Sequence, residues 1–298
     1  MRNAFIDQLI LHAKKNEKIF LIVGDLGFSV IEPFVELFPD RFLNAGVAEQ
    51  NMMGMAAGIA SEGYHVFVYS IANFPTFRCA EQIRNDVDYH KLPVTIVSTG
   101  GGLGYGNLGY SHHAIQDYGL MRMFPNMIIA APGDPMEVRG CVNYLVKNPQ
   151  PSYLRLGKSG EPCLHETIPE INPGEWLQIN KNKERSLDKT ILTTGGVLFI
   201  ANQWLTSEKY RDYSLHSIPL WGMSLKSTQE KKAQEWNVIV TIEDHLRDCG
   251  FGSWFGEAIH DISELNLNHK VISLDSNVCG LVGSQSELNK LGGLFLEN

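Results

Sequence analysis

The feature that most constrains the fold of this chain is a series of short, continuous apolar runs, each closed by a turn. A short apolar run of this kind is typical of a strand buried on both faces of a sheet. Segments with helical character separate the runs, at residues 48–61 and 135–147. Strands that alternate with helices predict a parallel α/β sheet. The runs in the first half lie at residues 19–23, 66–69, 94–97 and 127–130.

The second half of the chain repeats the alternation after an interruption. Between Pro149 and Pro173 the pattern gives way to Pro, Gly, Asn and Glu, which is typical of a linker. Strands are then expected at 189–193, 238–242 and 270–274, with a helix at 253–265. At 298 residues the chain is about twice the length of a typical domain. We therefore predict two α/β domains, at residues 1–160 and 175–298, joined by a linker at 161–174.

Charge and cysteine content exclude several classes of function. The net charge of −8 and the pI of about 5.7 argue against a nucleic-acid partner. The five cysteines include no CxxC pair, which disfavours a zinc site and a disulfide framework. No apolar run reaches the length of about 18 residues that a membrane span needs. We expect a cytoplasmic protein with no membrane segment and no metal site of its own.

One acidic residue stands at the expected start of a helix. Glu49 lies between a Gly-Val-Ala turn and a helix rich in small residues, which let a ligand or another backbone approach closely. The helix dipole stabilises a carboxylate at this position. On this segment alone, two explanations of Glu49 are equally good. It is either a functional carboxylate or a solvated acid of the first helical turn.

Two loops follow the next strands of the first domain. The segment YSIANFPTFRCAEQIRND, residues 69–86, places aromatic residues and an Asn on a loop that leads into a helix. The segment STGGGLGYGNLGYSHHAIQD, residues 98–117, is rich in glycine and contains the pair His112-His113. It lacks the helix context of a dinucleotide fingerprint and any Walker lysine. A glycine-rich loop with two histidines at the carboxyl end of a strand indicates the rim of an active site.

The order of these segments resembles the pyrimidine-binding domain of transketolase and its relatives. The matching pieces appear in the family's order, and the later segment VTIEDHLRDCGFGSW, residues 240–254, is similar to the opening of the family's C-terminal domain. The resemblance covers nearly the whole chain. The earlier pieces are GDLGFS at 24–29, RFLNAGVAEQNMMGMAAGIA at 41–60, the aromatic loop, GYSHHAIQDYGLMRMFPNM at 109–127 and APGD at 131–134.

The resemblance implies thiamine diphosphate as cofactor and a role for Glu49. The cofactor reacts through a thiazolium carbon, whose proton its own aminopyrimidine removes after conversion to the imino form. That conversion needs a carboxyl group hydrogen-bonded to the far ring nitrogen, and the resemblance places Glu49 there. The family also packs an aromatic side chain on the pyrimidine. Here Ile71 best matches that position, with Phe74 and Phe77 nearby.

The resemblance also implies residues that contact the substrate. His112 matches the family histidine that points at the substrate hydroxyls, and it is a candidate for proton transfer. We expect His113 to support its neighbour or cap a helix, with substrate contact as the alternative. Ser29 and Arg155 match positions at the substrate's phosphate end, and a guanidinium suits a phosphate. Pairing of Arg155 with an acid at an interface is equally compatible with its position.

A further implication concerns what this chain lacks. The family holds Mg²⁺ and the diphosphate with a GDG motif and a later Asn pair, whereas this chain has Gly24-Asp25-Leu26 and no other candidate. We therefore expect a separate N-terminal transketolase subunit with the diphosphate-binding domain, in an α2β2 heterotetramer that transfers a two-carbon ketol unit between sugars or sugar phosphates. The alternatives are a beta subunit of a 2-oxoacid dehydrogenase, a deoxyxylulose phosphate synthase-like enzyme, and a noncatalytic interaction subunit.

Overall fold

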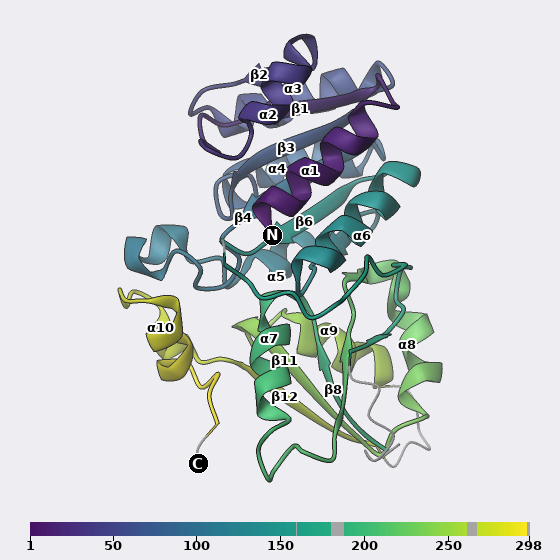
Figure 1. Cartoon of the computed structure of the whole chain (residues 1–298), viewed down its shortest axis with the longest axis vertical. Coiled ribbons are helices and arrows are strands. Elements are labelled where there is room, and N and C mark those ends of the chain that lie inside the picture. The colour runs from purple at the N-terminus through teal and green to yellow at the C-terminus, as the bar shows by residue number, and fades with distance from the viewer. Residues whose placement is uncertain (159, 180–187, 261–266, 297–298) are drawn as a thin grey trace.

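The chain forms two α/β units, each a mostly parallel sheet with the helices that pack on it (Figure 1). These units are called the first and second layers below. The computed structural model describes residues 1–158, 160–179, 188–260 and 267–296. Within these residues the first sheet has seven strands in the order β10-β5-β6-β4-β3-β1-β2. Its strands are β1 (Ile19–Val23), β2 (Phe42–Asn44), β3 (His65–Ile71), β4 (Val94–Thr99), β5 (Ile128–Ala130), β6 (Ser152–Leu156) and β10 (Leu220–Trp221).

The apolar runs form the centre of this sheet. Val68 of β3 lies opposite Ile22 of β1 and Ile96 of β4 in parallel register, and none of the three side chains is exposed. Strands buried on both faces need apolar side chains at successive positions, which explains the continuous runs. The predicted parallel α/β sheet is confirmed.

Helices cover both faces of the first sheet. On one face Phe5 and Leu9 of α1 join a core with Val138 and Leu145 of α6, while α3 packs on the other face. Helix α6 begins after Asp134, whose side chain accepts a hydrogen bond from the Glu137 amide and caps the helix. The helices of this part are α1 (Arg2–Ala13), α2 (Glu32–Leu37), α3 (Glu49–Ser61), α4 (Ala80–Gln82), α5 (Asp117–Met121) and α6 (Pro135–Lys147).

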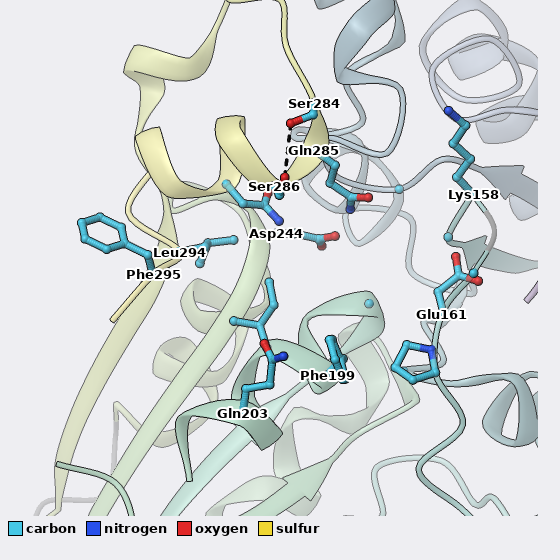
Figure 2. A pocket seen from close by; sticks show the side chains of 18 of the residues that line it. Lys158, Glu161, Phe199, Gln203, Asp244, Ser284, Gln285, Ser286, Leu294 and Phe295 are labelled. Carbon is cyan, nitrogen blue, oxygen red and sulfur yellow. Dashed lines mark hydrogen bonds between the residues drawn. The ribbon is translucent and has the colours of Figure 1, made fainter. Parts of the chain in front are cut away.

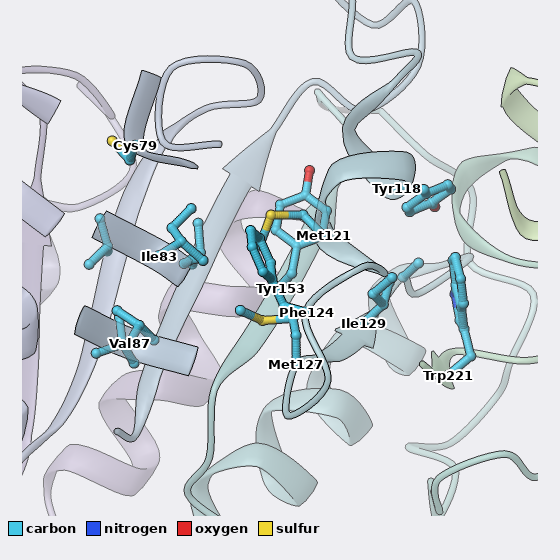
Figure 3. Packing of buried hydrophobic residues seen from close by; sticks show 14 of the residues in the cluster. Cys79, Ile83, Val87, Tyr118, Met121, Phe124, Met127, Ile129, Tyr153 and Trp221 are labelled. Atoms are coloured by element: carbon cyan, nitrogen blue, oxygen red, sulfur yellow. The ribbon is translucent and has the colours of Figure 1, made fainter. Parts of the chain in front are cut away.

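The helix after the aromatic loop is irregular. Helix α4 is followed at once by a π-helical segment, η3 (Ile83–Asp88). Figure 3 shows Ile83 and Val87 of this segment on the same side of the sheet as Cys79, facing a cluster that includes Tyr153. All four side chains are buried without exposed surface. This packing fixes the segment that follows the aromatic loop.

The second sheet has five strands within the described residues, in the order β12-β11-β8-β9-β7. The strand expected at 189–193 is found with those bounds, whereas β11 (Val238–Leu246) runs past the expected end at 242. The predicted helix at 253–265 begins earlier, at Phe251, and its last residues from 261 lie outside the described part. The other elements are β7 (Leu177–Gln178), β8 (Lys189–Thr193), β9 (Ser214–Ser217), β12 (Asn268–Leu274), α7 (Leu198–Trp204), α8 (Lys226–Ala233), α9 (Phe251–Ile259) and α10 (Gln285–Leu291).

The two sheets are joined more closely than the sequence indicated. Strand β10 comes from the second half of the chain, yet it pairs antiparallel with β5 at the edge of the first sheet. Strand β6 lies inside the segment from Pro149 to Pro173. The first sheet therefore continues into the segment where the sequence no longer shows alternating strands and helices. Residues 161–174 contain no helix or strand in their described structure. The domain bounds at 160 and 175 remain a prediction.

Helices that could cross a membrane are not found in the described chain, because none combines sufficient length with apolar character.

Candidate functional site

Glu49 is buried at the carboxyl edge of the first sheet. It is the first residue of α3, and only 2% of its surface is exposed. A Cβ added to Gly24, which directly follows β1, would lie 3.7 Å from Glu49 Cγ. The carboxylate is therefore placed by the start of α3 and by the end of β1.

Arg78 is the ionic partner of Glu49, and it was not among the residues predicted from the sequence. Its Nη1 donates a hydrogen bond of 2.7 Å to Oε2 of Glu49. Arg78 itself is 47% exposed, so the pair has one buried member and one member in solvent. A buried carboxylate needs such a partner. The sequence does show a cation, Arg78, within the segment that contains the aromatic loop. Nothing in the sequence indicates that this residue contacts Glu49.

Phe74 lies next to two other side chains at this edge of the sheet, Arg78 and His112. The guanidinium of Arg78 lies 4.8 Å from the centre of the Phe74 ring, and the His112 ring lies 5.3 Å away in an edge-to-face geometry. Ile71 ends β3 and is partly buried, whereas Phe77 is 47% exposed. Of the three residues predicted to pack on the cofactor, Phe74 is the one that lies between Arg78 and His112.

The two histidines of the glycine-rich loop have different surroundings. His112 is partly exposed, and burial together with the neighbouring His113 lowers its pKa below the ordinary value. Its imidazole is therefore neutral at neutral pH and able to accept a proton. His113 has no exposed surface, and its Nε2 lies 3.4 Å from the Gly106 carbonyl oxygen. His113 is therefore enclosed by the protein, and its supporting role stays a prediction.

Asn73 attaches the histidine loop to the end of β3. Its Nδ2 donates to the backbone oxygens of His113 at 2.7 Å and Ser111 at 3.3 Å. The loop also depends on Gly100 and Gly102, which have φ of +81° and +64°. A Cβ at Gly100 would overlap the Tyr105 ring. These constraints hold His112 next to Phe74.

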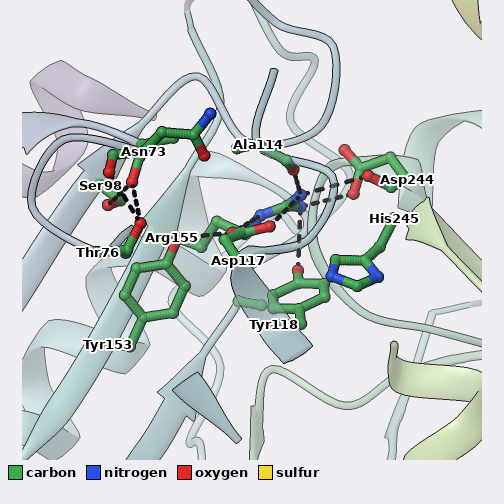
Figure 4. A network of polar contacts seen from close by, with 12 residues as sticks. Asn73, Thr76, Ser98, Ala114, Asp117, Tyr118, Tyr153, Arg155, Asp244 and His245 are labelled. Carbon is green, nitrogen blue, oxygen red and sulfur yellow. Dashed lines mark hydrogen bonds and ion pairs between the residues drawn. The ribbon is translucent and has the colours of Figure 1, made fainter. Parts of the chain in front are cut away.

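Arg155 does not reach the open edge of the site. It lies in β6 with 3% of its surface exposed, and Figure 4 shows its guanidinium enclosed by acceptors. Nε donates to Asp117 at 2.7 Å, Nη1 to Asp244 at 2.6 Å and to Tyr118, and Nη2 to Ala114 O at 2.7 Å. With further contacts at 3.3 and 3.4 Å, every N–H has an acceptor.

These contacts correct the expectation that Arg155 binds a substrate phosphate. Asp244 belongs to β11 of the second sheet, so the ion pair joins the two layers, as the alternative interpretation of Arg155 proposed. His245 stacks on Tyr118 at 5.3 Å and has no exposed surface. Asp244 and His245 therefore both contact residues of the first layer.

Lys158 is a second exposed cation at this edge besides Arg78, and it too was absent from the sequence-based prediction. It follows the carboxyl end of β6 and is exposed. Its Nζ lies 5.3 Å from the centre of the Tyr105 ring, which in turn lies 6.4 Å from His112. Ser29, the other residue predicted at a phosphate, is exposed in the loop after β1 with φ +64°, and its amide donates to Glu32 Oε1 at 2.7 Å.

Groups of three or more His, Cys, Asp or Glu side chains that could hold a metal ion are not found among the described residues.

Three comparisons relate this chain to known proteins. Residues 1–161 match the family described as "Transketolase, pyrimidine binding domain". A putative transketolase C-terminal section of Methanocaldococcus jannaschii is 34% identical over 301 aligned positions, which cover 99% of this chain and 92% of that protein. One subunit of the apulose-4-phosphate transketolase of Phocaeicola vulgatus is 30% identical over 287 positions, 93% of this chain and 88% of that protein.

The fold is also similar to that of a solved structure. A structure described as "Split gene transketolase, inactive beta4 tetramer" superposes with a TM-score of 0.81 and 28% sequence identity, over 98% of this chain and 93% of that one.

Proposed function

Because this chain belongs to the transketolase family, we propose that it is the pyrimidine-binding subunit of a split, thiamine diphosphate-dependent transketolase. In this proposal the complete enzyme transfers a two-carbon ketol unit between sugars or sugar phosphates, and it works only with a separate subunit. The observation that carries the proposal is a buried carboxylate, Glu49, at the carboxyl edge of a parallel sheet, near a partly buried aromatic ring, Phe74.

The residues present fit the pyrimidine half of the cofactor. Oε2 of Glu49 is bonded to Arg78, while Oε1 has no hydrogen-bond partner among the described residues and is free to meet a ring nitrogen. The Phe74 ring offers a flat apolar face for a heterocycle. Bound thiamine diphosphate would supply the nucleophilic carbon for ketol transfer. Glu49 would hold a proton at the pyrimidine nitrogen, and Arg78 would keep the carboxylate oriented.

His112 and Lys158 are proposed to meet the substrate. The neutral imidazole of His112 can exchange a proton with a substrate oxygen at the edge of the site. Lys158 provides a positive charge for an anionic group farther along the same edge, since Arg155 has no free N–H. Ser29 stays a candidate for a further polar contact there.

A separate polypeptide is proposed to complete the site. It would carry the GDG-containing domain that binds Mg²⁺ and the diphosphate, and the working assembly would be an α2β2 heterotetramer. The names of the two relatives support this arrangement, since one is a transketolase C-terminal section and the other a single subunit of a transketolase. So do exposed apolar side chains on the loops that follow β1 to β4. They are Phe28, Val47, Phe77, Leu108 and Tyr110, each 47–75% exposed.

The proposal is tested by replacing Glu49 in the reconstituted enzyme. We expect Glu49→Gln to lower kcat by at least about 100-fold, as loss of a general acid-base group does. Glu62→Gln is the matched control, because Glu62 is exposed at the other end of α3. Unchanged turnover in Glu49→Gln would mean a noncatalytic subunit. Turnover with a 2-oxoacid donor in place of a ketose would mean one of the neighbouring enzyme activities.

A further inference from the structure

A cavity of about 700 Å³ lies between the two layers, away from Glu49 (Figure 2). Its walls are the chain after β6, helix α7, and the start of α10 with the segment that follows it. The volume falls within the range of small-molecule sites, which often lie between domains and combine apolar walls with a few polar groups. Lys158, which the proposed function assigns to the substrate, also lines this cavity, whereas Glu49, Phe74 and His112 do not.

The polar groups of the cavity are mostly acceptors or uncharged amides and hydroxyls. Figure 2 shows the Asp244 carboxylate pointing into the space between Phe199 and Gln203 of α7 and the α10 residues Gln285 and Ser286. Asp244 is 4% exposed. Its Oδ1 accepts from Arg155 at 2.6 Å, but its Oδ2 has no hydrogen-bond partner among the described residues.

A second acceptor lies in the wall formed by α10. Asn289 is 7% exposed, and its Oδ1 has no hydrogen-bond partner within the described part of the chain. Leaving a buried acceptor without a partner costs free energy, so a hydrogen-bond donor in the cavity would be stabilised. The ring of Phe199, which also lines the cavity, is 36% exposed and provides an apolar face.

The charges around the cavity disfavour an anionic ligand. The Arg155 guanidinium is fully engaged with Asp117, Asp244 and other acceptors. The Lys158 ammonium is turned toward the Tyr105 ring, 5.3 Å from its centre. Glu161 is paired with the N-terminal ammonium at 2.9 Å. The charged group that points into the cavity is the Asp244 carboxylate (Figure 2), and its Oδ2 would repel a phosphate or carboxylate placed beside it.

We propose that this cavity binds a small, uncharged, hydroxylated molecule such as a free sugar or polyol. Its hydroxyls would donate to Asp244 Oδ2 and exchange hydrogen bonds with Gln203 and Gln285, and its apolar face would pack on Phe199. This site is independent of the proposed cofactor site. Arg155 lines the cavity and donates a hydrogen bond to the backbone oxygen of Ala114. Ala114 lies in the same loop as His112.

Binding is tested with three probes of similar size and different charge. Glucose, glucosamine and glucose 6-phosphate are titrated against the full chain by saturation-transfer NMR. We expect glucose to bind, glucosamine to bind no more than tenfold more tightly, and glucose 6-phosphate to bind at least tenfold more weakly at this site. Binding of none of them, or a preference for the phosphate, would overturn the proposal. Glucosamine binding more than tenfold tighter would instead indicate charge recognition and would also overturn it.

Variants locate the binding site. Gln203→Leu should weaken glucose binding by about tenfold, since it removes a hydrogen-bonding group from the cavity while Gln203 is exposed enough for the fold to tolerate the change. The matched control is Gln234→Leu, at an exposed position on the C-terminal end of α8, which should bind as the wild type does. Loss of binding in His112→Ala but not in Gln203→Leu would place the sugar in the Glu49 site and overturn this inference alone.

Discussion

Glu49 is held by contacts that come from three separate segments. The start of α3 places the residue, Gly24 at the end of β1 leaves room beside it, and Arg78 pairs with its carboxylate. The sequence could identify Glu49, because a carboxylate at a helix entrance and the resemblance to a family both marked the position. Arg78 could not be found in this way, since the pair depends on contact across 29 residues of chain.

Arg155 shows the opposite error, in which a residue type indicated a function that its surroundings exclude. An arginine near a strand end is a reasonable phosphate ligand when its neighbours are unknown. In the fold, Asp117 and Asp244 enclose it from two other elements. The exposed cation nearest to Arg155 along the chain is Lys158, three residues later. The burial of Arg155 and the exposure of Lys158 decide which of these two cations can meet a phosphate. Both depend on the whole fold.

Lys158 leads to a prediction about substrate charge. Lys158→Met should raise KM for a phosphorylated sugar by about 10- to 100-fold, because a hydrogen bond to a charged group contributes about 1.5–3 kcal/mol. The KM for the unphosphorylated sugar and kcat should change little. Steady-state kinetics of the reconstituted enzyme measures both constants. Lys147→Met, at an exposed position on α6, is the control. Equal effects on both sugars would contradict the role assigned to Lys158.

At the scale of elements, the long apolar runs could be predicted and the short strands could not. β1 and β8 have the bounds that the sequence indicated, because a buried parallel strand leaves a continuous apolar run. β10 has two residues, and β6 directly follows Pro151 and contains Arg155. Both segments depend on partners that are distant in sequence: β5 pairs with β10, and two carboxylates neutralise Arg155.

The ion pairs of β6 predict a large loss of stability on substitution. Arg155→Met should lower the free energy of unfolding by about 3–5 kcal/mol, because it leaves Asp117 and Asp244 buried without their partner. The matched control is Arg139→Met on α6, since Arg139 pairs with the exposed Asp7 and should cost less than about 1 kcal/mol. Urea unfolding followed by circular dichroism measures both. Similar losses in the two variants would contradict the structural role of Arg155.

At the scale of the whole molecule, buried histidines make stability depend on pH. Burial lowers the pKa of His65 to about 3, and those of His216 and His269 to about 4. The unfolded chain binds protons at these residues below about pH 6.5, whereas the folded chain does not. Stability is therefore fully present above about pH 6.5 and is lost as the pH falls toward the folded-state values.

His65 provides the direct check of this dependence. Each such histidine contributes a slope of up to about 1.4 kcal/mol per pH unit below about pH 6.5. His65→Gln should remove one such contribution while keeping a group able to bond Thr95, which lies 2.8 Å from Nε2. Urea unfolding at pH 5, 6 and 7 gives the slope. His90→Gln is the control because His90 is exposed. Equal slopes for His65→Gln and the wild type would show that His65 is not buried in its neutral form.

The central claim is that this chain supplies one half of a cofactor site. The measurement that tests it most directly is calorimetric titration of thiamine diphosphate with Mg²⁺ into this chain alone, and then into its mixture with a polypeptide carrying the GDG-containing domain. The account predicts tight binding only in the mixture, weakened in Glu49→Gln. Tight binding by this chain alone, or no binding in the mixture, would contradict it.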